Sequence, residues 1–93
     1  MTVYELVVME GDERSKMAKE MVERCLGEGI LGEDGVLKVI VLRGRDDLNA
    51  APRDLGIQKA PALYVGGKWY QGLNEIRNFL QKLKVRGDEE RIQ

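Results

Sequence analysis

The sequence predicts a single α/β domain in which helices cover both faces of a four-stranded mixed sheet. Three observations support this prediction. Two short segments rich in β-branched residues flank a segment with helical spacing, a Gly-Gly pair joins two further short strands, and a second helical pattern follows them. The resulting order of elements is β-α-β-α-β-β-α. A chain of 93 residues is long enough for one hydrophobic core and too short for two.

The first half of the chain has the pattern of a strand, a helix and a second strand. Residues Val3–Met9 and Val36–Leu42 are largely apolar, which is typical of strands that are covered on both faces. Between them lie apolar residues at helical spacing: Met17, Ala18, Met21, Val22, Cys25 and Leu26. Asp12 or Ser15 can cap the N-terminus of this helix. A strand, a helix and a strand in this order form a right-handed unit with parallel strands.

The segment after the second strand has helical spacing over Leu48–Leu55. Pro52 lies inside this segment, and a proline in the interior of a helix costs about 3 kcal/mol. We therefore expect a helix here that is short or kinked, or that begins again with Pro52 in its first turn.

A β-hairpin is predicted next. Residues 62–65 and 68–71 have strand composition, and Gly66–Gly67 between them is typical of a tight hairpin turn. Ala60–Pro61 opens the hairpin, and we expect this peptide bond to be cis, with a trans proline at the sheet edge as the alternative.

The last pattern in the chain is an amphipathic helix. Its apolar residues recur at helical spacing: Leu73, Ile76, Phe79, Leu80 and Leu83. The residues after it are mostly charged. We therefore place the domain at residues 3–85 and expect residues 86–93 to form a disordered tail.

The composition excludes many functions. There is no histidine, which excludes a Ser/His/Asp triad, a Cys–His nucleophile and a histidine metal ligand. The single cysteine excludes an internal disulfide, a CxxC redox pair and a zinc knuckle. The 15 Lys+Arg and 16 Asp+Glu residues nearly balance, so there is no general basic field for nucleic acid or acidic lipid. We expect no metal, no nucleic-acid partner and no membrane partner.

The expected location is the cytoplasm. The N-terminal apolar segment is not preceded by a basic region, as it would be in a signal peptide. No apolar segment approaches the roughly 20 residues of a membrane span. A lone thiol suits a reducing compartment. Abundant Glu, Lys and Arg with scarce Asn and Gln lean toward a thermophilic source.

The second half of the sequence carries a specific resemblance. Ala60–Pro61 occupies the place of a cis-proline dipeptide, Val-Gly-Gly-Lys at 65–68 matches a hairpin motif, and Gly72–Ile76 matches a Gly-x-Asp-Asp-Leu segment. With Gly56, these residues resemble the thioredoxin fold in its compact glutaredoxin form. The N-terminal domain of glutathione transferases shares part of the pattern. The resemblance in element order covers roughly residues 3–83.

The chain departs from that family at the residues that carry its chemistry. When Ala18-Lys19-Glu20 is set against a similar segment of glutaredoxins, Asp12 stands in place of the nucleophilic cysteine and Ser15 in place of the resolving one. Met9 stands in place of a lysine that contacts glutathione. Asn74 replaces an aspartate of the glutathione pocket. Asp12 cannot attack a disulfide, since that step needs a sulfur.

The resemblance therefore implies a non-catalytic binding or adaptor module that takes a protein or peptide partner in the remnant of the active-site groove. The free backbone edge at Ala60–Pro61 would pair with an extended peptide in that fold. The alternative is a glutathione-dependent or thiol-redox protein with an atypical site and with glutathione as its ligand. The predicted site residues are Asp12, Glu13, Arg14, Ser15, Ala60, Pro61, Gly72, Leu73 and Asn74.

Single residues in this pattern keep two interpretations. Asp12 is a helix cap or an anion that holds a ligand. Cys25 is a small core residue or a redox switch. Trp69 and Tyr70 belong to the core, or one of them is a contact site, and the strand edge beside them would then join two copies of the chain.

Overall fold

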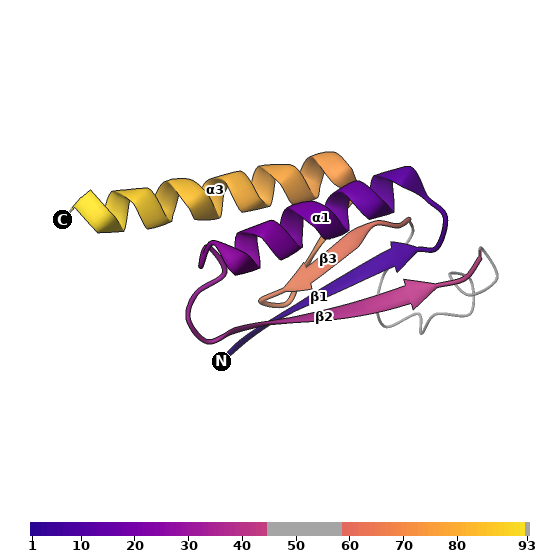
Figure 1. Cartoon of the computed structure of the whole chain (residues 1–93), viewed down its shortest axis with the longest axis horizontal. Coiled ribbons are helices and arrows are strands. Elements are labelled where there is room, and N and C mark those ends of the chain that lie inside the picture. The colour runs from indigo at the N-terminus through magenta and orange to yellow at the C-terminus, as the bar shows by residue number, and fades with distance from the viewer. Residues whose placement is uncertain (45–58, 93) are drawn as a thin grey trace.

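The computed structural model describes residues 1–44 and 59–92, and side chains are described through Arg86. The chain forms an α/β structure with one four-stranded mixed sheet (Figure 1). Its elements are β1 (Thr2–Met9), α1 (Glu13–Gly27), β2 (Gly35–Leu42), β3 (Ala62–Val65), β4 (Lys68–Gln71) and α3 (Leu73–Ile92). The helix predicted at Leu48–Leu55 and the matched residue Gly56 lie outside the described residues.

The sheet has the strand order β2-β1-β3-β4. β1 and β2 are parallel, as the sequence predicts, and their register runs without interruption from Thr2 opposite Gly35 to Met9 opposite Leu42. β3 pairs antiparallel with β1 and with β4. β1 is therefore an inner strand, whereas β2 forms one edge of the sheet.

The position of β2 corrects one expectation from the sequence. We predicted a strand covered on both faces, but Val36 is 44% exposed and Val41 is 55% exposed. An apolar, β-branched run is equally compatible with an inner strand and with a strand that has one neighbour only. β1 and β2 have similar composition, and the pairing of β3 with β1 leaves β2 at the edge.

Both described helices pack on the same face of the sheet, side by side (Figure 1). The core lies between these helices and the inner strands, and its buried residues are Tyr4, Leu6, Val8, Ala18, Val22, Leu31, Leu63, Ile76 and Leu80. The expectation of helices on both faces depends on the segment outside the described residues. The apolar stripe predicted for α1 is only partly buried, because Met17 is 45% exposed and Leu26 is 38% exposed.

The hairpin forms as predicted. Gly66 has a φ of 61° and Gly67 a φ of 79°, the pair of left-handed conformations that a type I′ turn requires. Trp69 and Tyr70 are half-buried and each packs against another ring, Trp69 on Tyr64 at 4.9 Å and Tyr70 on Phe79 at 4.3 Å between centroids. They are thus partly core residues. The Ala60–Pro61 peptide bond is cis, as predicted.

The C-terminal helix is longer than the sequence analysis allows. We predicted a disordered tail over residues 86–93, whereas the backbone of α3 is helical through Ile92. Arg, Glu and Ile all tolerate the helix, and Gly87 alone costs only about 1 kcal/mol relative to alanine. In Figure 1, α3 extends well past the end of α1.

Candidate functional site

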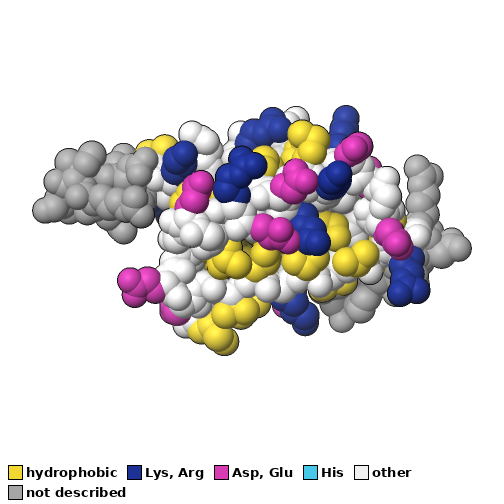
Figure 2. Space-filling model, viewed as in Figure 1, with side chains coloured by type: hydrophobic (Ala, Val, Ile, Leu, Met, Phe, Trp, Pro, Cys, Tyr) yellow, Lys and Arg dark blue, Asp and Glu magenta, His cyan; other side chains and the backbone are white. Residues whose placement is uncertain are grey.

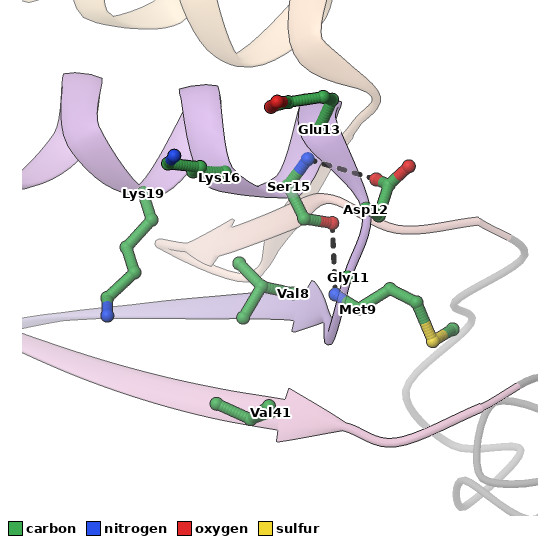
Figure 3. Close-up of a pocket in the computed structure, with 9 residues that line it drawn as sticks. All are labelled: Val8, Met9, Gly11, Asp12, Glu13, Ser15, Lys16, Lys19 and Val41. Carbon is green, nitrogen blue, oxygen red and sulfur yellow. Dashed lines mark hydrogen bonds between the residues drawn. The ribbon is translucent and has the colours of Figure 1, made fainter.

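The turn from β1 into α1 is closed by two side chains. Asp12 has an extended backbone, and its carboxylate accepts a hydrogen bond from the Ser15 N–H at 2.9 Å, which makes it the N-cap of α1 (Figure 3). The Ser15 hydroxyl accepts a hydrogen bond from the Met9 N–H at 2.9 Å. Ser15 is only 1% exposed. Both side chains are therefore engaged in holding the end of β1 against the start of α1.

A shallow depression of about 360 Å³ opens beside this turn, between α1 and the carboxyl ends of β1 and β2 (Figure 3). Val8, Met9 and Val41 give it an apolar floor. Its other lining residues are Gly11, Asp12, Glu13, Ser15, Lys16 and Lys19. Two carboxylates and two ammonium groups leave this depression without net charge, so it has no preference for an anionic or a cationic ligand.

A second depression, of about 280 Å³, lies at the start of α3. It is the more polar of the two, and its lining residues are Arg14, Lys59, Gln71, Gly72, Leu73, Asn74 and Glu75. We call it the Arg14–Lys59 depression. It contains two cationic groups and one carboxylate, and the carboxylate of Glu75 accepts a hydrogen bond from the Gln71 N–H at 3.2 Å. With two cationic side chains and one carboxylate, this depression has a net positive charge.

Gly72 shapes the floor of the Arg14–Lys59 depression. Its φ is +89°, and a Cβ built on it would lie 3.2 Å from Cε and 3.3 Å from Nζ of Lys59. Its N–H donates to the Pro61 carbonyl at 2.7 Å, which ties the start of α3 to the start of β3. A side chain at position 72 would strain the backbone and push the Lys59 ammonium group out of its place.

The structure divides the predicted site residues between the two depressions. Arg14 comes together with Gly72, Leu73 and Asn74 in one, whereas Asp12, Glu13 and Ser15 line the other. Neither of these two depressions is lined by Ala60 or Pro61, and Pro61 is almost fully buried.

Sequence reasoning missed Lys59 in this group. Lys59 is exposed and lies next to Ala60, where no periodic pattern distinguishes it from other lysines on the surface. The only available signal was its place in the sequence between Gly56 and Ala60–Pro61, which match the glutaredoxin pattern.

Cys25 lies far along α1 from the capped turn. It is half-buried and packs against the core cluster, in keeping with its interpretation as a small core residue. Burial raises the pKa of its thiol, and the nearby Glu28 carboxylate raises it further, against the opposing effect of Lys84 and Arg24. A thiol with a raised pKa is a weak nucleophile near neutral pH, because the thiolate is the reactive form.

Among the described side chains of residues 1–44 and 59–86, no group of three His, Cys, Asp or Glu is arranged to hold a metal ion. None of the helices in this part of the chain is long and apolar enough to cross a membrane. Comparisons with models of protein families, with curated proteins and with solved structures find no match to this chain.

Proposed function

We propose that this chain is a thioredoxin-fold, glutaredoxin-like binding module without catalytic activity, and that it binds the carboxylate of a peptide or protein partner in the Arg14–Lys59 depression. The architecture supports the first part of this proposal. A parallel β-α-β unit precedes an antiparallel hairpin, and the helix after the hairpin packs beside the first helix. This is the element order that the resemblance implies for the described part of the chain.

The absence of catalysis is supported by what occupies the start of α1. The helix dipole at this position would favour a thiolate, but the chain places the Asp12 carboxylate and the buried Ser15 hydroxyl there. Thiol–disulfide exchange needs a sulfur nucleophile. The thiol of Cys25 lies elsewhere and has a raised pKa.

The observation that carries the binding proposal is the charge of the Arg14–Lys59 depression. Two cationic side chains meet at the N-terminus of a long helix, where the first N–H groups have no acceptor within the helix and the dipole favours an anion. A carboxylate placed there would accept hydrogen bonds from Arg14 and Lys59. The side-chain amide of Asn74, on the same wall, would bond the adjoining peptide group.

Calorimetric titration tests this proposal. The probe is a set of short peptides that end in a free carboxylate, each paired with the same peptide ending in an amide. We expect binding of the carboxylate form and at least about tenfold weaker binding of the amide form, since a hydrogen bond to a charged group contributes about 1.5–3 kcal/mol. Lys59→Gln and Arg14→Gln should each weaken binding, whereas the exposed Lys82→Gln on α3 should not. Equal binding of both peptide forms would refute the carboxylate site.

The alternative is a glutathione-dependent or thiol-redox protein. Glutathione is itself a small peptide with two carboxylates. The positive charge of the same depression therefore also favours glutathione as a ligand. The two proposals differ in turnover. Reduction of a disulfide substrate that persists in Cys25→Ser would refute a non-catalytic role, and binding of glutathione without turnover would leave glutathione as a ligand only.

A further inference from the structure

The outer edge of β2 has the properties of a strand that pairs with another strand. All eight residues of β2 pair with β1 in one uninterrupted register, so this edge contains no bulge. No strand in the described parts of the chain pairs with its other side. The backbone N–H and C=O groups that point outward from such an edge are a template for an additional strand.

The side chains of β2 give this edge little protection, since a single lysine is its only charged residue. Val36 and Val41 are 44% and 55% exposed, and Lys38 is the only charged residue of the strand. Lys38 lies opposite Glu5 in the register with β1, so a residue of opposite charge lies on the neighbouring strand. Figure 2 shows hydrophobic side chains gathered on the face along which β1 and β2 run in Figure 1. Prolines and bulges are common protections of an exposed edge, and β2 has neither.

We propose that β2 pairs antiparallel with β2 of a second copy of this chain. The twofold axis would be perpendicular to the sheet and would pass between the two copies of Val39. The two four-stranded sheets would join into one continuous sheet. A twofold axis of this kind brings residues of the same sheet face opposite each other. The register that follows sets Val39 opposite itself, Leu37 opposite Val41 and Val36 opposite Leu42.

The charges and side chains of β2 favour pairing with a second copy of this chain over pairing with a strand from another protein or peptide. In the register centred on Val39, each exposed valine of the edge gains an apolar partner from the same short sequence. A register centred on Lys38 would set two like charges opposite each other, which is destabilising. With one lysine on β2 and Glu5 opposite it on β1, the edge has no excess of either charge that would attract an acidic or basic peptide.

The opposite edge of the sheet is less suited to this role. β4 has only four residues, and Lys68 is exposed on it. The rings of Trp69 and Tyr70, for which the sequence left a dimer contact open, already pack within the chain. Since the Arg14–Lys59 depression lies at the end of β4 and the start of α3, a dimer through β2 would leave it open.

Sedimentation equilibrium of the full chain tests the interface. We expect a dimer, and we expect Val41→Lys to raise its dissociation constant at least about tenfold, because each copy would bring an ammonium group to an apolar contact. The matched control is Val85→Lys on α3, where the valine is similarly exposed at 47% and lies far from β2 in the fold. A monomeric wild-type chain, or a dimer weakened equally by both substitutions, would overturn the proposal. Circular dichroism checks that each variant is folded.

A cross-link tests the register independently of any loss of stability. In a Cys25→Ser background, Val39→Cys should form a disulfide-linked dimer on mild oxidation, since directly opposed residues of antiparallel strands have Cα atoms within the range that a disulfide spans. Lys38→Cys should cross-link at least about tenfold more slowly, because its copies would be offset along the strands. Cross-linking that is faster through position 38 than through position 39 would refute the proposed register.

Discussion

At the scale of single residues, Asp12 and Ser15 hold the turn from β1 into α1 and do not line the proposed binding site. At the positions where the resemblance places two sulfur atoms, the chain has a carboxylate that caps α1 and a hydroxyl that receives the Met9 N–H. These hydrogen bonds satisfy two backbone donors at a turn that is partly removed from water. Both side chains therefore serve the structure of the turn. The positive charge that a ligand would meet lies on Arg14 and Lys59, in the other depression.

Removal of the cap should destabilise the chain measurably. Asp12→Ala deletes the acceptor of the Ser15 N–H, and we expect a loss of about 1 kcal/mol in the free energy of unfolding. Asp12→Asn keeps an acceptor oxygen and should lose less. Urea unfolding curves of the three proteins measure the difference, and equal midpoints for all three would contradict the assignment of Asp12 as the cap.

Because of Tyr4, the free energy of unfolding should fall at alkaline pH. Its hydroxyl donates to the Leu31 carbonyl at 3.3 Å, and burial, with a smaller effect of the Asp34 carboxylate, raises the pKa of the phenol. Below about pH 10 the phenol is protonated in both the folded and the unfolded chain, and its contribution is complete. As the pH rises further, the unfolded phenol ionises first and the free energy of unfolding falls.

Ultraviolet absorbance of the phenolate and urea unfolding between pH 9 and pH 11 check this prediction. Tyr4→Phe should remove the part of the alkaline loss that is due to Tyr4, and it should cost about 1 kcal/mol at neutral pH because the Leu31 carbonyl loses its partner. The half-buried Tyr70 serves as the control through Tyr70→Phe. An unchanged alkaline loss in Tyr4→Phe would contradict the predicted sign.

At the scale of elements, the hairpin could be predicted and the sheet edges could not. Gly66–Gly67 specifies a turn locally, because few other residues adopt two successive left-handed conformations. The exposure of β2 depends on long-range packing. Nothing within the sequence Val36–Leu42 tells whether one or two strands will pair with it.

Gly67→Ala should destabilise the hairpin by about 1–2 kcal/mol, which is the cost of a left-handed conformation for a residue with a Cβ. A Cβ at this position meets nothing within 4 Å, so the effect would be conformational and not steric. Gly27→Ala in α1 is the matched control, since a Cβ there is also free of contacts and the φ is negative. Thermal unfolding should give a lower Tm for Gly67→Ala only, and a lower Tm for both variants would contradict this reason.

At the scale of the whole molecule, the sequence predicted the mixed sheet, the parallel pairing and the cis bond, whereas the site residues stay a prediction. It placed Arg14, Gly72, Leu73 and Asn74 in one groove with Asp12 and Ser15, whereas the structure divides these residues between two depressions. The approach of Lys59 to Gly72 depends on the packing of two loops, for which the sequence contains no periodic signal.

The most direct test of the central claim, that the Arg14–Lys59 depression binds a carboxylate, is a map of amide chemical-shift changes. Uniformly labelled protein is titrated with a peptide that ends in a free carboxylate and, separately, with its amide. We predict saturable shifts at Gly72, Leu73 and Asn74 with the carboxylate form alone, and an unaltered peptide at the end of the titration. Shifts confined to the depression between Asp12 and Lys19, or shifts that are equal for the two peptides, would contradict the claim.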